Sequence, residues 1–343
     1  MSKKILVTGG TGYIGSHTVV ELQQAGYEVV IIDNLSNSNE SVLDGIVNIT
    51  GKRPIFYNID CTDMNSLIPL FSEHAFDGII HFAASKAVGE SVQKPLLYYR
   101  NNLVSLINLL ELMPQYNVKG IVFSSSCTVY GEPDSNPIDE NAPIKPAASP
   151  YGNSKQINEE IIKDFIHSGA DVKSIILRYF NPIGAHPSAE IGELPLGVPQ
   201  NLVPYITQTG IGIREQLSVF GDDYNTPDGS CIRDFINVVD LAKAHVIAIE
   251  RMLNDKSNEK VEIFNLGTGK GVSVLELIGF FEKVSGTSLN YKIVDRREGD
   301  IEKIWAQPDK ANNVLGWKAE KSVEETMESA WKWQLRLREK GVM

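Results

Sequence analysis

The sequence has few cysteines and no apolar run long enough to cross a membrane. Cys61, Cys127 and Cys231 are odd in number and far apart, and no Cys-x-x-Cys occurs. This excludes a disulfide framework, and neither the cysteines nor the histidines have the spacing of metal ligands. Met1-Ser2-Lys3-Lys4 before a short apolar strand does not resemble a signal peptide. We therefore expect a cytoplasmic protein with no metal and no membrane partner.

Positive charge is also scarce. Lys and Arg number 32 against 43 Asp and Glu, for a net charge of −11 at pH 7. The chain has no basic run and no interleaved aromatic and basic residues, which argues against nucleic acid or an anionic membrane surface as a partner. An anionic ligand would need locally placed arginines.

What the chain does contain is an alternation of apolar strands and amphipathic helices. Its 343 residues are enough for one large α/β unit or for two domains that share an interface. Expected strands cover residues 4–8, 28–33, 55–60, 78–83, 120–125, 174–180 and 262–266. Expected helices cover residues 13–25, 65–74, 96–113, 241–253, 273–284 and 322–338, and another starts at about residue 150. This alternation predicts a doubly wound parallel sheet with helices on both faces.

The first expected strand ends in a glycine-rich turn. Gly9, Gly12 and Gly15 form a Gly-x-x-Gly-x-x-Gly pattern that permits a sharp turn and close approach of a pyrophosphate to the helix N-terminus. Asp33 ends the second strand, eighteen residues after Gly15, where an acid accepts hydrogen bonds from an adenosine ribose and repels a 2′-phosphate. We predict a dinucleotide site that favours NAD over NADP. A purely structural glycine turn is the alternative.

Other polar and small residues follow the expected strands. In parallel sheets ligands bind beyond the carboxyl ends of the strands, where Asp60-Cys61, Phe82-Ala83-Ala84 and Ser124-Ser125-Ser126 stand. Small residues at Ala83, Ala84 and Ser124 would equally suit tight strand exits. The hydroxyl of Ser126 is placed to meet Tyr151.

The segment Ser149-Pro150-Tyr151-Gly152-Asn153-Ser154-Lys155 begins a helix, because Ser149 can cap it and Pro150 suits its first position. Tyr151 and Lys155 are four residues apart and share one helix face. A tyrosine that acts as a base at neutral pH needs its pKa lowered by about 3 units, or about 4 kcal/mol. One positive charge at about 5 Å supplies about 3 kcal/mol at an effective dielectric of about 20, so Lys155 and a second cation would suffice. The alternative is a solvated surface pair.

The composition changes in the second half of the chain. Residues 133–150 form a proline-rich connecting loop, and after Asn181-Pro182 glycine, proline and turn residues dominate to about Asp234. We expect an NAD-binding domain of residues 1–181 plus about 236–266. Residues of about 182–235 plus 267–343 are expected to form a smaller mixed α/β domain for the substrate.

Motifs along nearly the whole chain resemble the extended short-chain dehydrogenase/reductase family, and within it the enzymes that epimerise nucleotide sugars. The motifs are Val7-Thr8-Gly9-Gly10-Thr11-Gly12-Tyr13-Ile14-Gly15-Ser16-His17, His81-Phe82-Ala83-Ala84, Lys86-Ala87-Val88-Gly89-Glu90-Ser91, Ser124-Ser125-Ser126-Cys127-Thr128-Val129-Tyr130-Gly131, Tyr179-Phe180-Asn181, Arg233-Asp234-Phe235-Ile236, Asn265-Leu266-Gly267-Thr268-Gly269 and Arg296-Arg297-Glu298-Gly299-Asp300. The resemblance implies a Rossmann-type domain that keeps NAD bound, a domain for a UDP-sugar, and a homodimer. It further implies an isomerase that interconverts UDP-galactose and UDP-glucose by oxidation at C4, rotation of the 4-keto sugar and hydride return.

The resemblance also assigns site residues. Tyr151 would take the proton of the sugar 4-hydroxyl, Ser126 would hydrogen-bond the 4-oxygen, and Lys155 would hold the nicotinamide ribose and lower the pKa of Tyr151. The NAD site would comprise Gly9, Gly12, Tyr13, Ile14, Gly15, Asp33, Asn34, Asp60, Cys61, Phe82, Ala83, Lys86, Asn101, Ser126, Tyr151, Lys155 and Phe180. The substrate site would comprise Lys86, Ser126, Tyr151, Asn181, Asn201, Leu202, Phe220, Arg233, Arg297, Asp300 and Ile304. A surface salt bridge is the alternative for the two arginines, and a turn or capping role is the alternative for Asn34, Asn101 and Asn201.

Other functions stay open at this point. Ile304 stands where relatives carry either an aromatic or a small residue, so use of UDP-N-acetylglucosamine is undecided. A nucleotide-sugar 4,6-dehydratase needs an acid and a base after the triad serine, but Cys127 and Thr128 stand there, and Thr128 also disfavours a decarboxylase. An NAD-sensing module without turnover would lack the tyrosine and lysine pair. Asn237 replaces a usual histidine, and we expect little effect.

Overall fold

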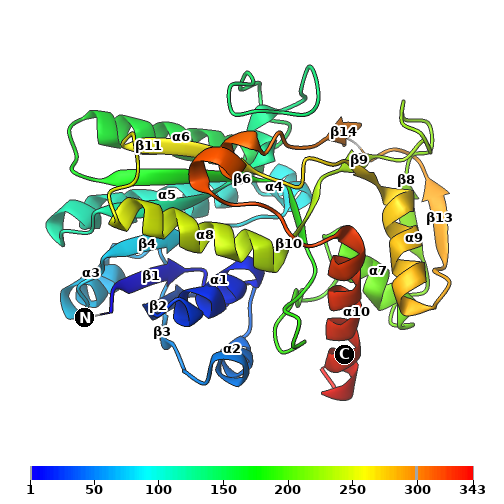
Figure 1. Cartoon of the computed structure of the whole chain (residues 1–343), viewed down its shortest axis with the longest axis horizontal. Helices are drawn as coiled ribbons and strands as arrows, with labels where there is room; N and C mark the ends of the chain where they lie inside the picture. Colours follow the sequence, from blue (N-terminus) through cyan, green and yellow to red (C-terminus); the bar gives the residue numbers. More distant parts are fainter. Residues whose placement is uncertain (1, 298–299, 343) are drawn as a thin grey trace.

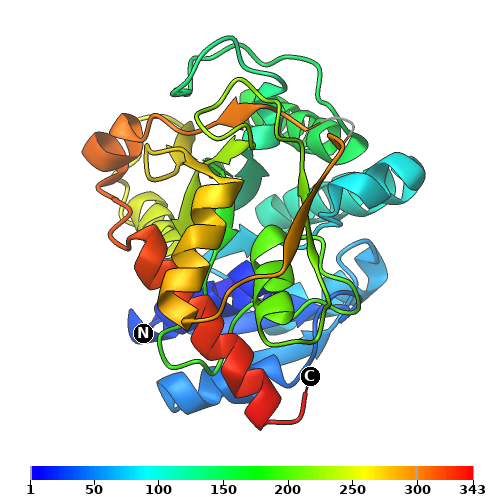
Figure 2. The same ribbon diagram turned by 90° about the vertical axis from the view of Figure 1, so that its right-hand side faces the viewer.

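The computed structural model describes residues 2–297 and 300–342, so Glu298 and Gly299 of the last motif lie outside the described residues. The chain forms a larger body around one parallel sheet and a smaller body of short strands and helices beside it (Figure 1). The second view shows helices of the smaller body in front of the larger one (Figure 2).

The sheet of the larger body has seven parallel strands in the order β11-β6-β5-β4-β1-β2-β3. Its strands are β1 (Lys4–Thr8), β2 (Glu28–Asp33), β3 (Ile55–Asn58), β4 (Gly78–His81), β5 (Gly120–Ser126), β6 (Lys173–Tyr179) and β11 (Val261–Leu266). The order reverses between β1 and β4, and such switch points are where ligands bind in open α/β sheets. The predicted strands and doubly wound fold class are confirmed.

Helices cover both faces of this sheet. They are α1 (Tyr13–Gln24), α2 (Val42–Thr50), α3 (Met64–Glu73), α4 (Val88–Gln93), α5 (Pro95–Gln115), α6 (Pro150–His167) and α8 (Val238–Leu253). Successive strand side chains point to opposite faces: Ile5 and Val7 pack in the core with α1, α2 and α8, and Leu6 packs with α3, α5 and α6. The near-continuous apolar strands of the sequence are therefore buried on both sides.

The smaller body has its own core and short sheets. Its elements are β7 (Asn181–Ile183), α7 (Leu202–Gly210), β8 (Leu217–Phe220), β9 (Ile232–Arg233), β10 (Phe235–Asn237), β12 (Val272–Ser273), α9 (Val274–Ser285), β13 (Tyr291–Val294), β14 (Lys303–Ile304) and α10 (Val323–Glu339). Two single-turn helices complete the fold, η1 (Cys127–Tyr130) and η2 (Ala311–Leu315). The core joins α7, α9 and α10 through Ile206, Phe281 and Met327.

Sequence reasoning missed α2, α4 and α7. The β-branched residues of α2 and its Gly45 are poor helix formers, which hid this helix in the sequence. Gly45 is needed for packing, because a Cβ there would stand 2.4 Å from the carbonyl oxygen of Glu190. The helix thus carries glycine where a segment of the smaller body crosses it. In α7 Pro204 and Thr207 lower the intrinsic helix preference, and burial of Ile206 stabilises the helix instead.

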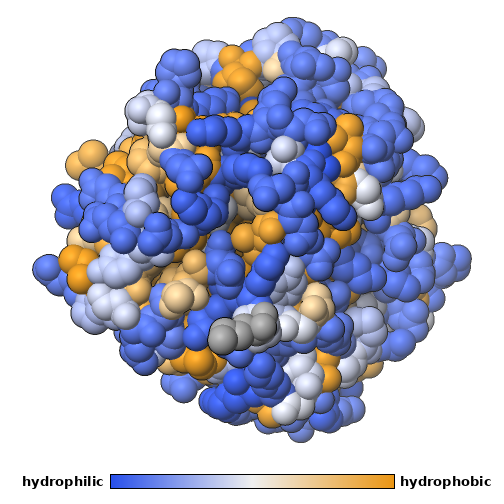
Figure 3. Space-filling model, turned by 60° about the vertical axis from the view of Figure 1, so that its left-hand side comes forward, coloured by the Kyte–Doolittle hydropathy of each residue, from blue (hydrophilic) through white to orange (hydrophobic). Residues whose placement is uncertain are grey.

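The face of the molecule shown in Figure 3 is mostly hydrophilic, with apolar side chains in separate groups. Within residues 2–297 and 300–342, no helix has both the length and the apolar character needed to span a bilayer.

Candidate active site

Tyr151 and Lys155 lie on the first two turns of α6, beside the carboxyl end of β5. The Ser149 hydroxyl caps α6 by accepting a hydrogen bond of 3.2 Å from the Gly152 N–H, as the sequence predicts. Lys155 Nζ is 5.9 Å from the centre of the Tyr151 ring and donates a hydrogen bond of 2.7 Å to the carbonyl oxygen of Ser124. Both side chains therefore face the strand ends, which argues against a solvated surface pair.

Burial dominates the electrostatics of this pair. It raises the pKa of Tyr151 to about 12, although a hydrogen bond with Ser126 opposes the increase. Burial also lowers the pKa of Lys155 to about 8, against the attraction of Glu159. The chain alone thus leaves the phenol protonated at neutral pH, and the predicted lowering of the Tyr151 pKa requires positive charge beyond Lys155.

Ser126 ends β5 and brings its hydroxyl to Tyr151. The hydroxyl oxygen also accepts a hydrogen bond of 3.2 Å from the Thr128 N–H, which starts η1. Ser126 thus meets Tyr151 and Lys155, which follow it by 25 or more residues in the sequence, at one strand end, as predicted.

The glycine turn fits a dinucleotide pyrophosphate. Gly9 has a φ of +69°, and a Cβ there would stand 2.8 Å from the Ala83 backbone nitrogen. A Cβ at Gly15 would stand 2.2 Å from the carbonyl oxygen of Gly9. Gly12 precedes α1 with no side-chain cap and no acid in the first turn, which leaves the positive helix end for an anion. Close packing therefore requires glycine at positions 9 and 15. At position 12, glycine leaves the helix N-terminus free to bind an anion.

Acidic residues follow the adjacent strand ends. Asp33 accepts a hydrogen bond of 3.2 Å from the Thr11 N–H, which places a carboxylate beside the glycine turn. The Asn34 side chain donates a hydrogen bond of 2.9 Å to Asp60, and buried Cys61 follows at the same edge of the sheet. These contacts give the predicted adenosine side of the NAD site a polar lining.

The remaining predicted NAD contacts surround the same strand ends. The Tyr13 hydroxyl donates a hydrogen bond of 2.6 Å to the carbonyl oxygen of Gly184, and the Phe82 ring lies 4.7 Å from that of His245 between centroids. Phe180 is buried after β6. Asn101 on α5 donates to the Ser85 hydroxyl at 3.0 Å, so its side chain does not cap a helix.

The structure adds Glu193, which sequence reasoning missed. Its carboxylate lies 3.8 Å from Lys86 Nζ of the larger body and accepts a hydrogen bond of 2.5 Å from Asn201 of the smaller body. Burial raises the pKa of Glu193, while Lys86 and Asn201 lower it. Lys86 of the larger body and Asn201 of the smaller body, both predicted to contact a ligand, therefore bind the same Glu193 carboxylate. No sequence motif connects these three residues.

The two predicted arginines converge on one acid. Arg233 lies 3.7 Å and Arg297 2.6 Å from Asp300 Oδ1, and the Arg297 guanidinium lies 5.6 Å from the centre of the Phe220 ring. Leu202 opens α7 and Asn181 opens β7. Ile304 lies farther along the same segment as Asp300 and is buried. The structure thus groups the two arginines, Phe220 and Asp300 in the smaller body.

Sequence reasoning also missed a buried ion pair that links α6 to β6. The Arg178 guanidinium on β6 donates two hydrogen bonds, of 2.9 Å and 2.5 Å, to the Glu159 carboxylate on α6. Glu159 also accepts a hydrogen bond of 2.6 Å from the Ser125 hydroxyl. Glu159 is four residues after Lys155 and so lies on the same face of α6. This spacing was the one feature of the sequence that could have indicated that Glu159 is buried.

The sheet, the glycine turn and the grouping of Ser126, Tyr151 and Lys155 define an extended short-chain dehydrogenase/reductase. A family model described as GDP-mannose 4,6 dehydratase matches residues 6–330. The chain is 51% identical over 330 residues to UDP-glucose 4-epimerase of Bacillus subtilis (strain 168), covering 96% of each chain. The chain therefore belongs to the UDP-glucose 4-epimerase family, which confirms the predicted resemblance.

Solved structures agree over the whole chain. UDP-glucose 4-epimerase from Bifidobacterium longum, in complex with NAD+ and UDP, has a TM-score of 0.94 and 46% identity and covers 97% of this chain and 98% of its own. The enzyme from Stenotrophomonas maltophila, with bound NAD and formylated UDP-arabinopyranose, has a TM-score of 0.95 and 46% identity, with 98% and 99% covered.

Proposed function

We propose that this protein is an NAD-dependent UDP-glucose 4-epimerase that interconverts UDP-galactose and UDP-glucose. The observation that carries the proposal is the meeting of Ser126, Tyr151 and Lys155 at the end of β5, beside the glycine turn after β1. The similarity to epimerases with bound NAD and UDP supports the same cofactor and substrate class.

The chain's own residues divide the chemistry among them. The Tyr151 phenol exchanges a proton with the sugar 4-oxygen, and the Ser126 hydroxyl donates a hydrogen bond to that oxygen. Lys155, buried beneath them, adds positive potential. When bound, NAD would supply reversible hydride transfer at C4 and, in its oxidised form, a positive charge. Tyr151 returns the proton to the 4-oxygen at the end of turnover. Because the hydride removed from C4 is also returned to C4, the reaction causes no net redox change.

Arg233 and Arg297 are proposed to hold the pyrophosphate of the UDP-sugar. A guanidinium presents paired N–H donors that match phosphate oxygens, and both arginines already lie beside Asp300 in the smaller body. We also propose the division into two domains that the sequence predicts. Residues 1–181 plus about 236–266 form the NAD-binding domain, and residues of about 182–235 plus 267–343 form the domain that binds the sugar nucleotide.

A dehydratase is disfavoured although the matching family model carries that description. Elimination of water across C5 and C6 needs an acid and a base beside the triad serine. Cys127 and Thr128 occupy those positions in η1, and burial raises the pKa of the Cys127 thiol to about 12. Neither side chain can replace a carboxylate.

The test is conversion of UDP-galactose to UDP-glucose by the purified protein with no NAD added. An epimerase that retains its cofactor is expected to reach an equilibrium mixture of UDP-galactose and UDP-glucose. Chromatography of samples taken over time measures the two sugar nucleotides. A protein that binds NAD but leaves UDP-galactose unchanged would be a non-catalytic module, and release of water from the sugar would identify a dehydratase.

We also propose a cytoplasmic homodimer that pairs α5 and α6. Leu97 at the start of α5 is exposed, together with Leu96, Val88 and Val92. Leu106 and Leu110 of the same helix pack inside the chain's own core, because α5 turns them toward the sheet. Light scattering at micromolar concentration is expected to give twice the mass of one chain, and a single-chain mass would refute the dimer.

A further inference from the structure

One side chain fixes the backbone on both sides of Ile304. The Asn136 amide donates a hydrogen bond of 3.0 Å to the carbonyl oxygen of Lys303 and accepts one of 3.0 Å from the Trp305 N–H. Asn136 lies in the connecting loop between η1 and α6, more than 160 residues earlier in the chain. This loop lies beside β14 at the top of Figure 1.

Ile304 lies between this loop and the catalytic strand end. Its side chain is 3% exposed and packs in one cluster with Cys127, Phe180 and Ile138. Cys127 follows Ser126 directly, and Ile304 is paired with Arg233 across β14 and β9. Ile304 therefore shares a cluster with the residue that follows Ser126 and is paired with an arginine proposed for the pyrophosphate.

We propose that Asn136 is a positioning residue that sets how closely Ile304 approaches the sugar, and thereby which substituent at C2 the site admits. The inference rests on the proposed epimerase function and on the place of Ile304 in the substrate site that the family resemblance implies. Asn136 itself does not touch the reacting atoms and acts through the backbone of residues 303–305.

The neighbouring segments have anchors of their own. The Ile138 N–H donates a hydrogen bond of 2.9 Å to the Trp305 carbonyl oxygen, and Asn265 donates 3.0 Å to the carbonyl oxygen of Ile138. The Ala306 N–H donates a hydrogen bond of 3.1 Å to the Asp234 carboxylate. Loss of the Asn136 amide therefore removes the two side-chain hydrogen bonds that flank Ile304, while the bond from Ile138 to Trp305 and the pairing of β14 with β9 keep the segment attached.

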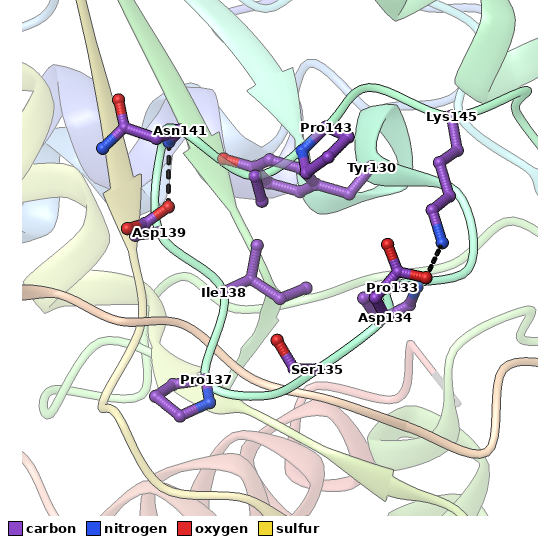
Figure 4. A pocket seen from close by; sticks show the side chains of 11 residues that line it. Tyr130, Pro133, Asp134, Ser135, Pro137, Ile138, Asp139, Asn141, Pro143 and Lys145 are labelled. Carbon is purple, nitrogen blue, oxygen red and sulfur yellow. Dashed lines mark hydrogen bonds and ion pairs between the residues drawn. The ribbon is translucent and has the colours of Figure 1, made fainter.

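The loop also leaves space beside Ile138, which packs with Ile304. A cavity of about 210 Å³ lies within the loop, lined in part by Ser135, Pro137 and Ile138 (Figure 4). Protein interiors contain few voids larger than a water molecule, so most core side chains cannot move without a clash. Ile138, which packs with Ile304 and borders this cavity, can give way.

The experiment compares kcat/KM for UDP-N-acetylgalactosamine and UDP-galactose in Asn136→Ala. The ratio of the two is expected to rise about fivefold or more, mainly through a lower KM for the acetamido sugar, because one small group in a pocket changes discrimination by about tenfold or more. The rate on UDP-galactose should stay within about twofold of wild type. Asn225→Ala is the matched control, because the exposed Asn225 contacts Glu302, near Ile304, through its backbone N–H at 3.1 Å and does not line the cavity.

Two further variants keep the result clear. Asn136→Asp keeps the acceptor for the Trp305 N–H and loses the donor to Lys303, so its ratio should lie between those of wild type and the alanine variant. Ile138→Val removes one methyl group from the cluster around Ile304 and should raise the ratio even if Asn136→Ala fails to fold. An unchanged or lower ratio in the folded variants would overturn the proposal, even if their thermal stability fell. A wild-type protein that converts neither sugar would instead refute the epimerase function.

Discussion

Tyr151→Phe is expected to slow the interconversion of UDP-galactose and UDP-glucose at least about 100-fold, the scale of losing acid and base catalysis. The substitution removes one hydroxyl and keeps the ring, so the packing beside Lys155 is preserved. NAD should remain bound, because the glycine turn and Asp33 are unchanged.

The expected loss reflects the environment of the phenol. Burial raises the pKa of Tyr151, so positive charge in the assembled site must stabilise the phenolate before this residue can act as a base near neutral pH. The site therefore stabilises the phenolate only when it is assembled, and phenylalanine has no group on which that stabilisation can act.

The measurement is the initial rate with saturating substrate, with NAD content determined by absorbance after denaturation. Tyr57→Phe is the matched control, because the Tyr57 hydroxyl bonds to His74 at 2.9 Å on the far edge of the sheet. A near-normal rate in Tyr151→Phe would refute the role of this residue.

Glu159→Gln is expected to lower the free energy of unfolding by about 3–5 kcal/mol, the usual cost of breaking a buried ion pair by removing one partner. Arg178 and Glu159 have side-chain exposures of 2% and 3%, so the guanidinium would stay buried without its counter-charge. The Arg178 contact to the Tyr130 hydroxyl at 2.9 Å cannot replace that charge.

Denaturant unfolding with NAD removed and with NAD present measures the effect. Glu324→Gln is the matched control, because Glu324 forms an ion pair of 2.8 Å with Lys283 at exposed positions, where a pair contributes about 0–1 kcal/mol. Equal stability losses in the two variants would contradict the assignment of a buried, uncompensated charge.

Most of the larger body was predictable from the sequence. The apolar runs from Lys4 to Thr8 and from Glu28 to Asp33 have the bounds of β1 and β2, because strands buried on both faces leave little room for polar residues. The glycine turn and the helix start at Ser149 carry local chemistry that any sequence with that geometry must show. Grouping Ser126 with Tyr151 needed two rules: ligands bind beyond the carboxyl ends of parallel strands, and the helix that starts near Ser149 returns the chain to that edge.

The smaller body was far less predictable. Its short strands are held by partners distant in the sequence, as when Ile138 pairs with Ala306. Asn136 and Glu193 are ordinary polar residues in loops, and their importance arises from what the fold brings beside them. The pKa of Tyr151 was also beyond sequence reasoning, since spacing indicates which charges are near and not how deeply the phenol is enclosed.

The edge strand β11 has a consequence for how the protein is made. Val261–Leu266 pairs with β6, and α8 covers one face of the same sheet, yet both follow the residues of β7, α7 and β8 in the chain. A growing chain that has left the ribosome only as far as residue 181 exposes an unpaired strand edge and an uncovered apolar face. The nucleotide-binding unit is thus completed only after much of its neighbour has been translated, and a fragment cut at that boundary would be prone to aggregate.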